Sequence, residues 1–305
     1  MYNRHPKLFP LIAVLAIACG DGDGVTAGTG GTGGEADPWG ATGGVAAFGG
    51  VGATGGTGSV GVAGEAGGTG DPCDECQVLE ECEGTRCVAE QVSLPGGFSI
   101  DATEVTRAQY EQWLATNPPV SDQPIFCEWN TSFTPQCDWA PELRDGRPVV
   151  CVDWCDASAY CKGLGRRLCG KIGGGSADYD EPNDPTSSQW FAACSAGGQN
   201  KYPYGDYPVV GMCQHRFSGG QYAAPVGSRT KCQSSVPEYA GVYDLSGNVW
   251  EWEDACSGYD QDSNNCLLRG GGFIQYSFVE ACDNPTSASR DRSRSDFGFR
   301  CCSAP

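Results

Sequence analysis

The segment that decides the fold reads GVYDLSGNVWEW and runs from Gly241 to Trp252. It places Asp244, a glycine turn and Glu251 within one short stretch that ends in two tryptophans. One interpretation is a tight turn whose tryptophans fill the core while the acidic residues are solvated. The other is a cation site, because Ca²⁺ prefers several hard oxygen ligands in a flexible arrangement. The residues alone leave both interpretations open.

Three other stretches of the chain carry patterns that accompany this segment. Residues 98–106 read FSIDATEVT, and residues 148–154 read PVVCVDW with GRRL following at 165–168. Residues 269–273 read RGGGF, and GFRC closes the pattern at 298–301. In this order the four segments resemble the formylglycine-generating-enzyme, or sulfatase-modifying-factor, domain family. The resemblance implies an α+β fold, a variant of the C-type-lectin-like fold, loop-rich, low in regular secondary structure and stapled by disulfides.

Three short helices are expected within this domain. Thr106 is a suitable N-cap for a helix that reaches Leu114, before the prolines at 118–119. A second helix is expected over 156–164 and a third over 188–195, each stopped by a glycine that follows. The remaining sequence predicts short extended pieces joined by Gly, Pro, Asn and Asp turns.

The resemblance implies a structural calcium ion at the first segment. In the family, the matching positions supply two side-chain oxygens and two backbone carbonyls. Here these would be the side chains of Asp244 and Glu251 and the carbonyls of Gly247 and Val249. Calcium is therefore the one cofactor that we expect.

The copper site of the family is not matched. The family enzyme holds copper(I) with two cysteines, and soft thiolates suit that ion. Counted from Arg269, the first cysteine position is Gln275 and the second is Glu280. We therefore assign no catalytic residue and expect no copper. The alternative is a remodelled copper site, with Cys282 and a neighbour such as Cys302, that oxidises a substrate cysteine with O₂.

The cysteine count predicts disulfides. The chain has 19 cysteines and only 2 histidines, which argues for bridges formed in an oxidising compartment over zinc sites. The family resemblance implies two pairs, Cys161 with Cys301 and Cys194 with Cys282. A small module at residues 71–90 holds Cys73, Cys76, Cys82 and Cys87, enough for two bridges or, alternatively, one zinc knot.

The N-terminal part of the sequence predicts export. Two basic residues precede an apolar run, Leu8 to Ala18, that is too short to span a bilayer as a helix. We interpret residues 1–18 as a signal peptide and Cys19 as a lipidated cysteine of a bacterial envelope lipoprotein; plain secretion is the alternative. Residues 19–70 form a glycine-rich tether, with 22 glycines between positions 20 and 70. The sulfatase-modifying-factor-like domain then occupies residues 91–305.

Charge limits the partners. The formal net charge is −19, so the chain repels phosphate backbones and nucleic acid is excluded as a partner. The leading hypothesis is a non-catalytic, calcium-stabilised recognition domain, held at the membrane by its lipid anchor. Its ligand would be a protein, a peptide or a glycan, and the sequence does not distinguish among these. The competing hypothesis is the formylglycine-generating-type oxidase described above.

Overall fold

A computed structural model describes residues 73–74, 76–137, 146–218, 221–260 and 264–304. The expected signal peptide, the lipidated Cys19 and the tether lie outside these residues. Residues 66–305 belong to one compact unit, and the elements below lie within it. No helix in the described residues is long and apolar enough to cross a membrane.

The three predicted helices are present, and side-chain caps explain where they start. Thr106 and Gln109 form a capping box at the first helix, and the Ser188 hydroxyl caps the third. The second helix begins two residues earlier than expected, because Asp153 and Asp156 form a capping box around its first turn. The helices are α1 (Arg107–Leu114), α2 (Trp154–Gly163) and α3 (Gln189–Cys194), with 3₁₀ turns η1 (Val120–Asp122), η2 (Ile125–Cys127) and η3 (Pro237–Tyr239).

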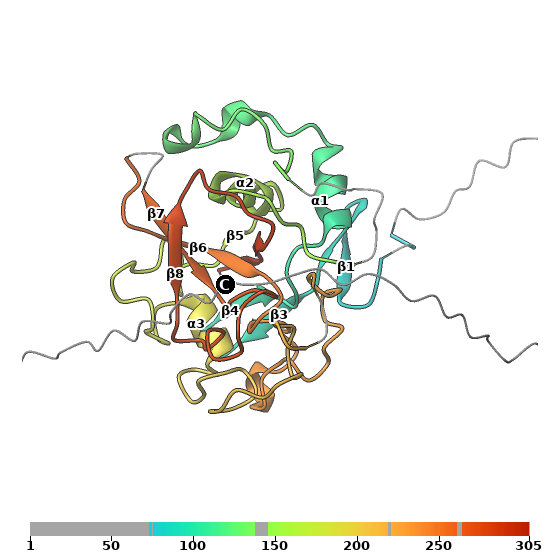
Figure 1. Ribbon diagram of the computed structural model, residues 1–305. Helices are drawn as coiled ribbons and strands as arrows, with labels where there is room; N and C mark the ends of the chain where they lie inside the picture. The colour runs from blue at the N-terminus through green and yellow to red at the C-terminus, as the bar shows by residue number, and fades with distance from the viewer. Residues whose placement is uncertain (1–72, 75, 138–145, 219–220, 261–263, 305) are drawn as a thin grey trace, which may run out of the picture. The chain divides into compact units, whose positions relative to one another are not determined.

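Two four-stranded sheets form the centre of the described unit. The first has the order β3-β4-β10-β5 and the second the order β8-β7-β6-β9. In Figure 1, α2 lies above β6 and β5, and α3 lies beside β4 of the first sheet. The strands of the first sheet are β3 (Gln91–Leu94), β4 (Phe98–Asp101), β5 (Arg167–Leu168) and β10 (Cys301–Ser303). Those of the second are β6 (Trp250–Cys256), β7 (Asn265–Arg269), β8 (Thr286–Ser289) and β9 (Phe297–Gly298).

The sheets bring the ends of the domain together. In the first sheet, Cys302 of β10 lies opposite Ile100 of β4, and Cys301 lies opposite Leu168 of β5. In the second, β6 pairs with β7 in antiparallel fashion and with β9 in parallel. The C-terminal strand thus completes a sheet that the start of the domain begins, which is a non-local arrangement that no local sequence pattern specifies.

The cysteine-rich module is part of the same compact unit. Its hairpin pairs β1 (Glu80–Glu83) with β2 (Arg86–Ala89). Val88 is buried in the main apolar core, and Arg166 donates to Glu81 and to the backbone carbonyl of Ala89. The module therefore rests on the larger domain, as expected for a segment too small to form a core alone.

Aromatic side chains fill the main core. Tyr110 of α1 stacks on Tyr160 of α2 with ring centroids 5.5 Å apart, and Phe299 meets Tyr160 edge-on at 5.4 Å. Trp252 is buried beside them, and its indole N–H donates to the carbonyl of Val152 at 3.1 Å. The predicted α+β, loop-rich, disulfide-stapled fold is confirmed.

Candidate functional site

The segment quoted first forms a sharply curled turn that leads into β6. Asp244 and Asn248 have φ angles of 59° and 58°, and Gly247 has a φ of 82°. Asp and Asn tolerate the left-handed region better than most residues, and glycine has no side-chain restriction there. A Cβ at Gly247 would lie 2.3 Å from the carbonyl oxygen of Gln214. The turn therefore requires glycine at this position.

Three of the four segments meet at a buried charge centre, which we define as Glu104, Asp244, Glu251 and Arg300. Arg300 donates two hydrogen bonds to Glu251, from Nε to Oε2 at 2.7 Å and from Nη2 to Oε1 at 2.8 Å. The Trp190 indole N–H also donates to Oε2 of Glu251, at 2.8 Å. Both oxygens of Glu251 are thus occupied by protein donors.

The other two carboxylates of the centre are held less tightly. Asn248 donates to Oε1 of Glu104 at 2.9 Å, while Oε2 of Glu104 lies 3.9 Å from the Arg300 guanidinium. The backbone N–H of Gly227 donates to Oδ2 of Asp244 at 2.7 Å. Burial raises the pKa of Glu104 well above its ordinary value and that of Asp244 to about 6. Three buried carboxylates therefore share one guanidinium.

This geometry bears on the calcium expectation for Asp244, Gly247, Val249 and Glu251. Asp244 and Glu251 lie in one centre and act on each other electrostatically, as the sequence interpretation requires. Glu251, however, has Arg300 as its counterion. In the described residues, only Cys76, Glu80 and Cys87 bring three acidic, histidine or cysteine ligand atoms within 4.8 Å of one another. Both of those sulfurs belong to a single disulfide. Calcium binding at the charge centre stays a prediction.

A second buried ion pair was not anticipated from the sequence. Arg269 donates from Nε to Oε2 of Glu253 at 2.8 Å, and the hydroxyl of Ser188, the cap of α3, donates to Oε1 at 2.7 Å. The Arg269 guanidinium also lies over the Trp190 ring, 5.3 Å from its centroid. Alternation along β6 gave no signal for this ion pair. Trp250 and Trp252 alternate with Glu251 and Glu253, which is the pattern of a strand with one solvated face, yet both acids are buried.

The two positions that correspond to the family's copper cysteines differ in their surroundings. The side-chain oxygen of Gln275 accepts from the backbone N–H of Gly272 at 3.1 Å, which closes a local turn. Glu280 is fully buried, and neither of its carboxylate oxygens accepts a hydrogen bond from a described residue. Burial raises the pKa of Glu280 to about 9. It fits there because Gly271 has no side chain: a Cβ at Gly271 would lie 2.6 Å from Cγ of Glu280.

Every cysteine in the described residues belongs to a disulfide. The structure joins Cys161 to Cys301 and Cys194 to Cys282, the two pairs that the resemblance implies. The remaining bridges are Cys73–Cys82, Cys76–Cys87, Cys127–Cys155, Cys137–Cys151, Cys169–Cys302, Cys213–Cys232 and Cys256–Cys266. The first two of these use all four cysteines of the small module, which favours two bridges over a zinc knot.

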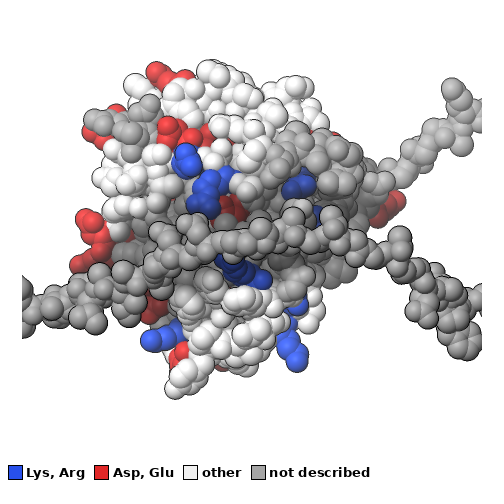
Figure 2. All heavy atoms as spheres, in the orientation of Figure 1, with Lys and Arg blue, Asp and Glu red and all other residues white. Residues whose placement is uncertain are grey.

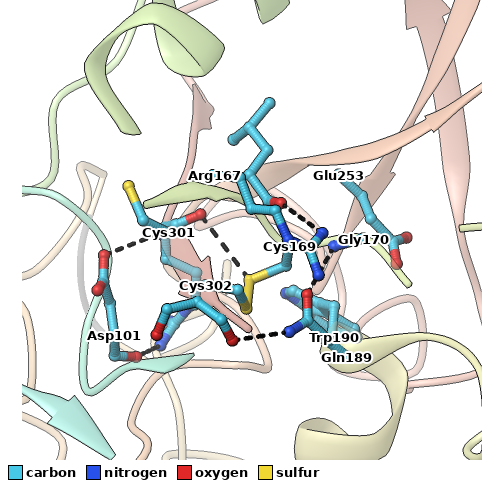
Figure 3. The surroundings of a disulfide bond; sticks show 12 residues. Asp101, Arg167, Cys169, Gly170, Gln189, Trp190, Glu253, Cys301 and Cys302 are labelled. Carbon is cyan, nitrogen blue, oxygen red and sulfur yellow. Dashed lines mark hydrogen bonds between the residues drawn. A yellow bond between two sulfur atoms is a disulfide. The ribbon is translucent and has the colours of Figure 1, made fainter. Parts of the chain in front are cut away.

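Figure 3 shows the bridge between Cys169 and Cys302, and the sulfur of Cys169 lies 4.0 Å from the backbone carbonyl oxygen of Arg300. Gln189 of α3 accepts from the N–H of Gly170, and Asp101 of β4 accepts from the N–H of Cys301 at 2.7 Å. The copper pair that the alternative hypothesis needs, Cys282 with Cys302, is not available as thiols, because each of these cysteines has a different disulfide partner.

Comparison with known proteins decides the family. The Sulfatase-modifying factor enzyme 1-like domain family matches residues 54–305. The chain belongs to this family. Among curated members, formylglycine-generating enzyme of Mus musculus is 27% identical over 195 residues, which cover 52% of this chain and 44% of that protein. Inactive C-alpha-formylglycine-generating enzyme 2 of Bos taurus is 32% identical over 171 residues, covering 51% and 50% respectively.

Two solved structures are similar to part of this chain. PvdO from Pseudomonas aeruginosa is 20% identical with a TM-score of 0.48, covering 68% of this chain and 80% of that one. Treponema denticola variable protein 1 is 18% identical, also with a TM-score of 0.48, covering 74% and 98%. The chain spans about half the length of the curated sulfatase-modifying-factor relatives it matches. The curated relatives thus include a protein named as an enzyme and a protein named as inactive.

Proposed function

We propose that this protein is a non-catalytic recognition module of the bacterial cell envelope, built on a sulfatase-modifying-factor-like domain. One observation carries the proposal: all cysteines in the described residues are paired as disulfides, and the two copper-ligand positions hold Gln275 and Glu280. Copper(I) chemistry of the family type needs free thiolates. A domain rich in disulfides belongs in an oxidising, extracytoplasmic compartment.

A free-thiol count on the purified protein, denatured without reduction, tests this proposal. We expect no free thiol in the mature protein, because the cysteines of residues 73–304 are bridged and the sulfur of a lipidated Cys19 is a thioether. Oxygen consumption with a sulfatase-type cysteine peptide and added copper(I) should equal the rate without protein. Two reproducible free thiols together with oxygen uptake would support the oxidase instead and overturn the recognition proposal.

The proposed membrane attachment rests on the leader and on Cys19. In a bacterial host, the wild-type protein is expected to incorporate an alkyne-labelled fatty acid and to sediment with membranes. Cys19→Ala should remove the label and move the protein to the soluble extracytoplasmic fraction. A label that persists in Cys19→Ala, or a wild type that is never labelled, would contradict lipidation at this residue.

Calcium is proposed as a structural ion held by the side chains of Asp244 and Glu251 and the carbonyls of Gly247 and Val249, next to the other residues of the charge centre. The support is that three buried carboxylates share one arginine, which leaves negative charge that a divalent cation would neutralise. Calcium should then raise the melting temperature of the wild type, and Asp244→Asn should lose most of that rise because a charged ligand is gone. Equal responses to calcium and magnesium, or equal responses of the two proteins, would remove calcium from the proposal.

A further inference from the structure

The loop from Phe273 to Phe278 contains Gln275, the first of the two positions at which the family motif carries a cysteine, and its residues line two hollows. The first hollow has a volume of about 200 Å³ and is lined by Arg107, Arg147, Tyr222 and Ile274 among others. The second has a volume of about 270 Å³ and is lined by Gln275, Arg292 and Arg294 among others. Adjacent residues of the loop, Ile274 and Gln275, thus face opposite hollows. We call the exposed side of residues 273–278 with these two hollows the loop surface.

The loop surface is basic in an acidic protein. Four arginines line the two hollows, and no described Asp or Glu lines either of them. Arg107 and Arg292 form no ion pair among the described residues, whereas Arg294 pairs with Asp296, Nε to Oδ1 at 3.1 Å. The whole chain has a net charge of −19. On the face shown in Figure 2, Lys and Arg side chains lie mostly in the middle and Asp and Glu mostly toward the rim.

Exposed aromatic side chains continue the loop surface. Phe278 is 65% exposed and Phe217 is 63% exposed. The Tyr276 ring stacks on Phe278 with centroids 5.5 Å apart and meets Phe217 at 5.3 Å. The Arg216 guanidinium lies over Tyr276, 5.3 Å from its centroid, and the Arg216 N–H donates to the carbonyl of Gln275. Aromatic residues interleaved with arginine are the composition of energetic hot spots at protein interfaces.

We propose that the loop surface binds an extended acidic peptide segment of a partner protein. The inference rests on the proposed recognition function and names the class of its ligand. An extended chain points successive side chains to opposite sides, so neighbouring carboxylates can enter hollows on the two sides of one loop. Guanidinium groups bind carboxylates through paired hydrogen bonds. Each hollow holds one such side chain, and the three-ring cluster takes the apolar residues beside it.

The charge distribution favours this occupant over others. A polyphosphate or nucleic acid would meet the long-range repulsion of a chain with a net charge of −19. A neutral glycan would stack on aromatic rings but would give Arg107 and Arg292 no charged partner. A short acidic segment meets the local basic charge and presents few further charges to the rest of the protein.

Fluorescence anisotropy with the full-length protein tests the proposal, using a labelled synthetic decapeptide of Glu-Glu pairs separated by Tyr. We expect saturable binding that weakens about tenfold between low and moderately high salt, because exposed charges are screened. Arg107→Ser and Arg292→Ser should each weaken binding about fivefold to tenfold, as expected when one charge-assisted contact is lost. Phe278→Ser should weaken it by a similar factor.

Matched controls distinguish binding at the loop surface from non-specific electrostatic or hydrophobic binding elsewhere on the protein. Lys231→Ser removes an exposed cation elsewhere, and Tyr207→Ser removes an aromatic residue that is 80% exposed elsewhere. Both should bind the peptide like the wild type. A decapeptide with Lys in place of every Glu should not bind. Melting temperatures of all variants, measured in parallel, show that each remains folded.

Three outcomes would overturn the inference. One is binding that Arg107→Ser and Arg292→Ser leave unchanged, and another is tighter binding of the Lys–Tyr peptide. The third is binding of a sulfated heparin hexasaccharide with no binding of the Glu–Tyr peptide, which would assign the surface to an anionic glycan. Each of these leaves the free-thiol count untouched, so the recognition proposal can survive when the acidic-peptide inference fails.

Discussion

Glu280 shows how one residue can change the pH dependence of the whole domain. Burial raises its pKa to about 9 from an ordinary value of 4.5. Between these two pH values the folded protein retains a proton that the unfolded chain releases. The free energy of unfolding is therefore unaffected by this carboxyl group below pH 4.5, and it falls as the pH rises toward 9. A buried carboxyl group without a described hydrogen-bond donor is stable only in its neutral form.

Replacing this carboxyl group should therefore stabilise the protein at alkaline pH. We expect Glu280→Gln to exceed the wild type by about 4 kcal/mol at pH 8 and to match it near pH 4.5. Guanidinium unfolding at the two pH values measures the difference. The exposed Glu238→Gln is the control and should show no such trend. A gap between wild type and Glu280→Gln that stays constant with pH would contradict the assigned protonation.

Arg300 is the counterion on which the buried charge centre depends. Arg300→Met would leave Glu251, Glu104 and Asp244 buried without a positive partner, and we expect a loss of about 4 kcal/mol in the free energy of unfolding. Adding Glu251→Met to Arg300→Met should restore part of that loss, since the partner charge is then also absent. Urea titrations of the single and double variants test this. A double variant whose loss in the free energy of unfolding equals the sum of the losses of Arg300→Met and Glu251→Met would show that the two residues do not stabilise each other.

At the scale of elements, two adjacent disulfides fasten β10 to the rest of the first sheet. Cys161–Cys301 joins β10 to α2, and Cys169–Cys302 joins it to the residue that follows β5. Their sequence separations are 140 and 133. While one bridge is intact, however, the other closes only a small loop, which consists of residues 161–169, residues 301–302 and the intact bridge. Either bridge alone therefore keeps the long loop closed when the other is removed.

The two bridges should for this reason be non-additive. Replacing either pair by alanines is expected to cost about 3 kcal/mol, and replacing both about 7 kcal/mol, because the second removal opens a much longer loop. Guanidinium unfolding under oxidising conditions measures all three variants. The separate hairpin bridge Cys256–Cys266 serves as a control whose removal should add independently to either one. Strict additivity of the two β10 bridges would contradict a shared loop.

At the scale of the whole molecule, all nine disulfides and both four-stranded sheets lie within residues 66–305. A fragment of these residues, exported to an oxidising compartment, should therefore have the same melting temperature as the full chain within about one degree. Differential scanning calorimetry of the two proteins tests this. A markedly lower value for the fragment would mean that residues 1–65 stabilise the domain.

The sequence could predict the parts that short patterns specify. The cap Thr106 located α1, and the glycines that follow residue 195 helped to locate α3. The four family segments predicted the fold class and the two disulfide pairs Cys161–Cys301 and Cys194–Cys282. The start of α2 was predicted two residues too late, because the capping box begins at Asp153 and the helix at Trp154. Local side-chain-to-backbone contacts leave signals in sequence, which is why these predictions were close.

What only the tertiary structure decided is which distant charges meet. By itself, the sequence determined the family, the absence of cysteines at positions 275 and 280, and the excess of negative charge. The folded chain showed that Arg300 occupies both oxygens of Glu251, and that arginines from 107, 147, 292 and 294 gather around one loop. Such contacts join positions separated by tens to hundreds of residues, and their energies depend on burial, which no local pattern encodes.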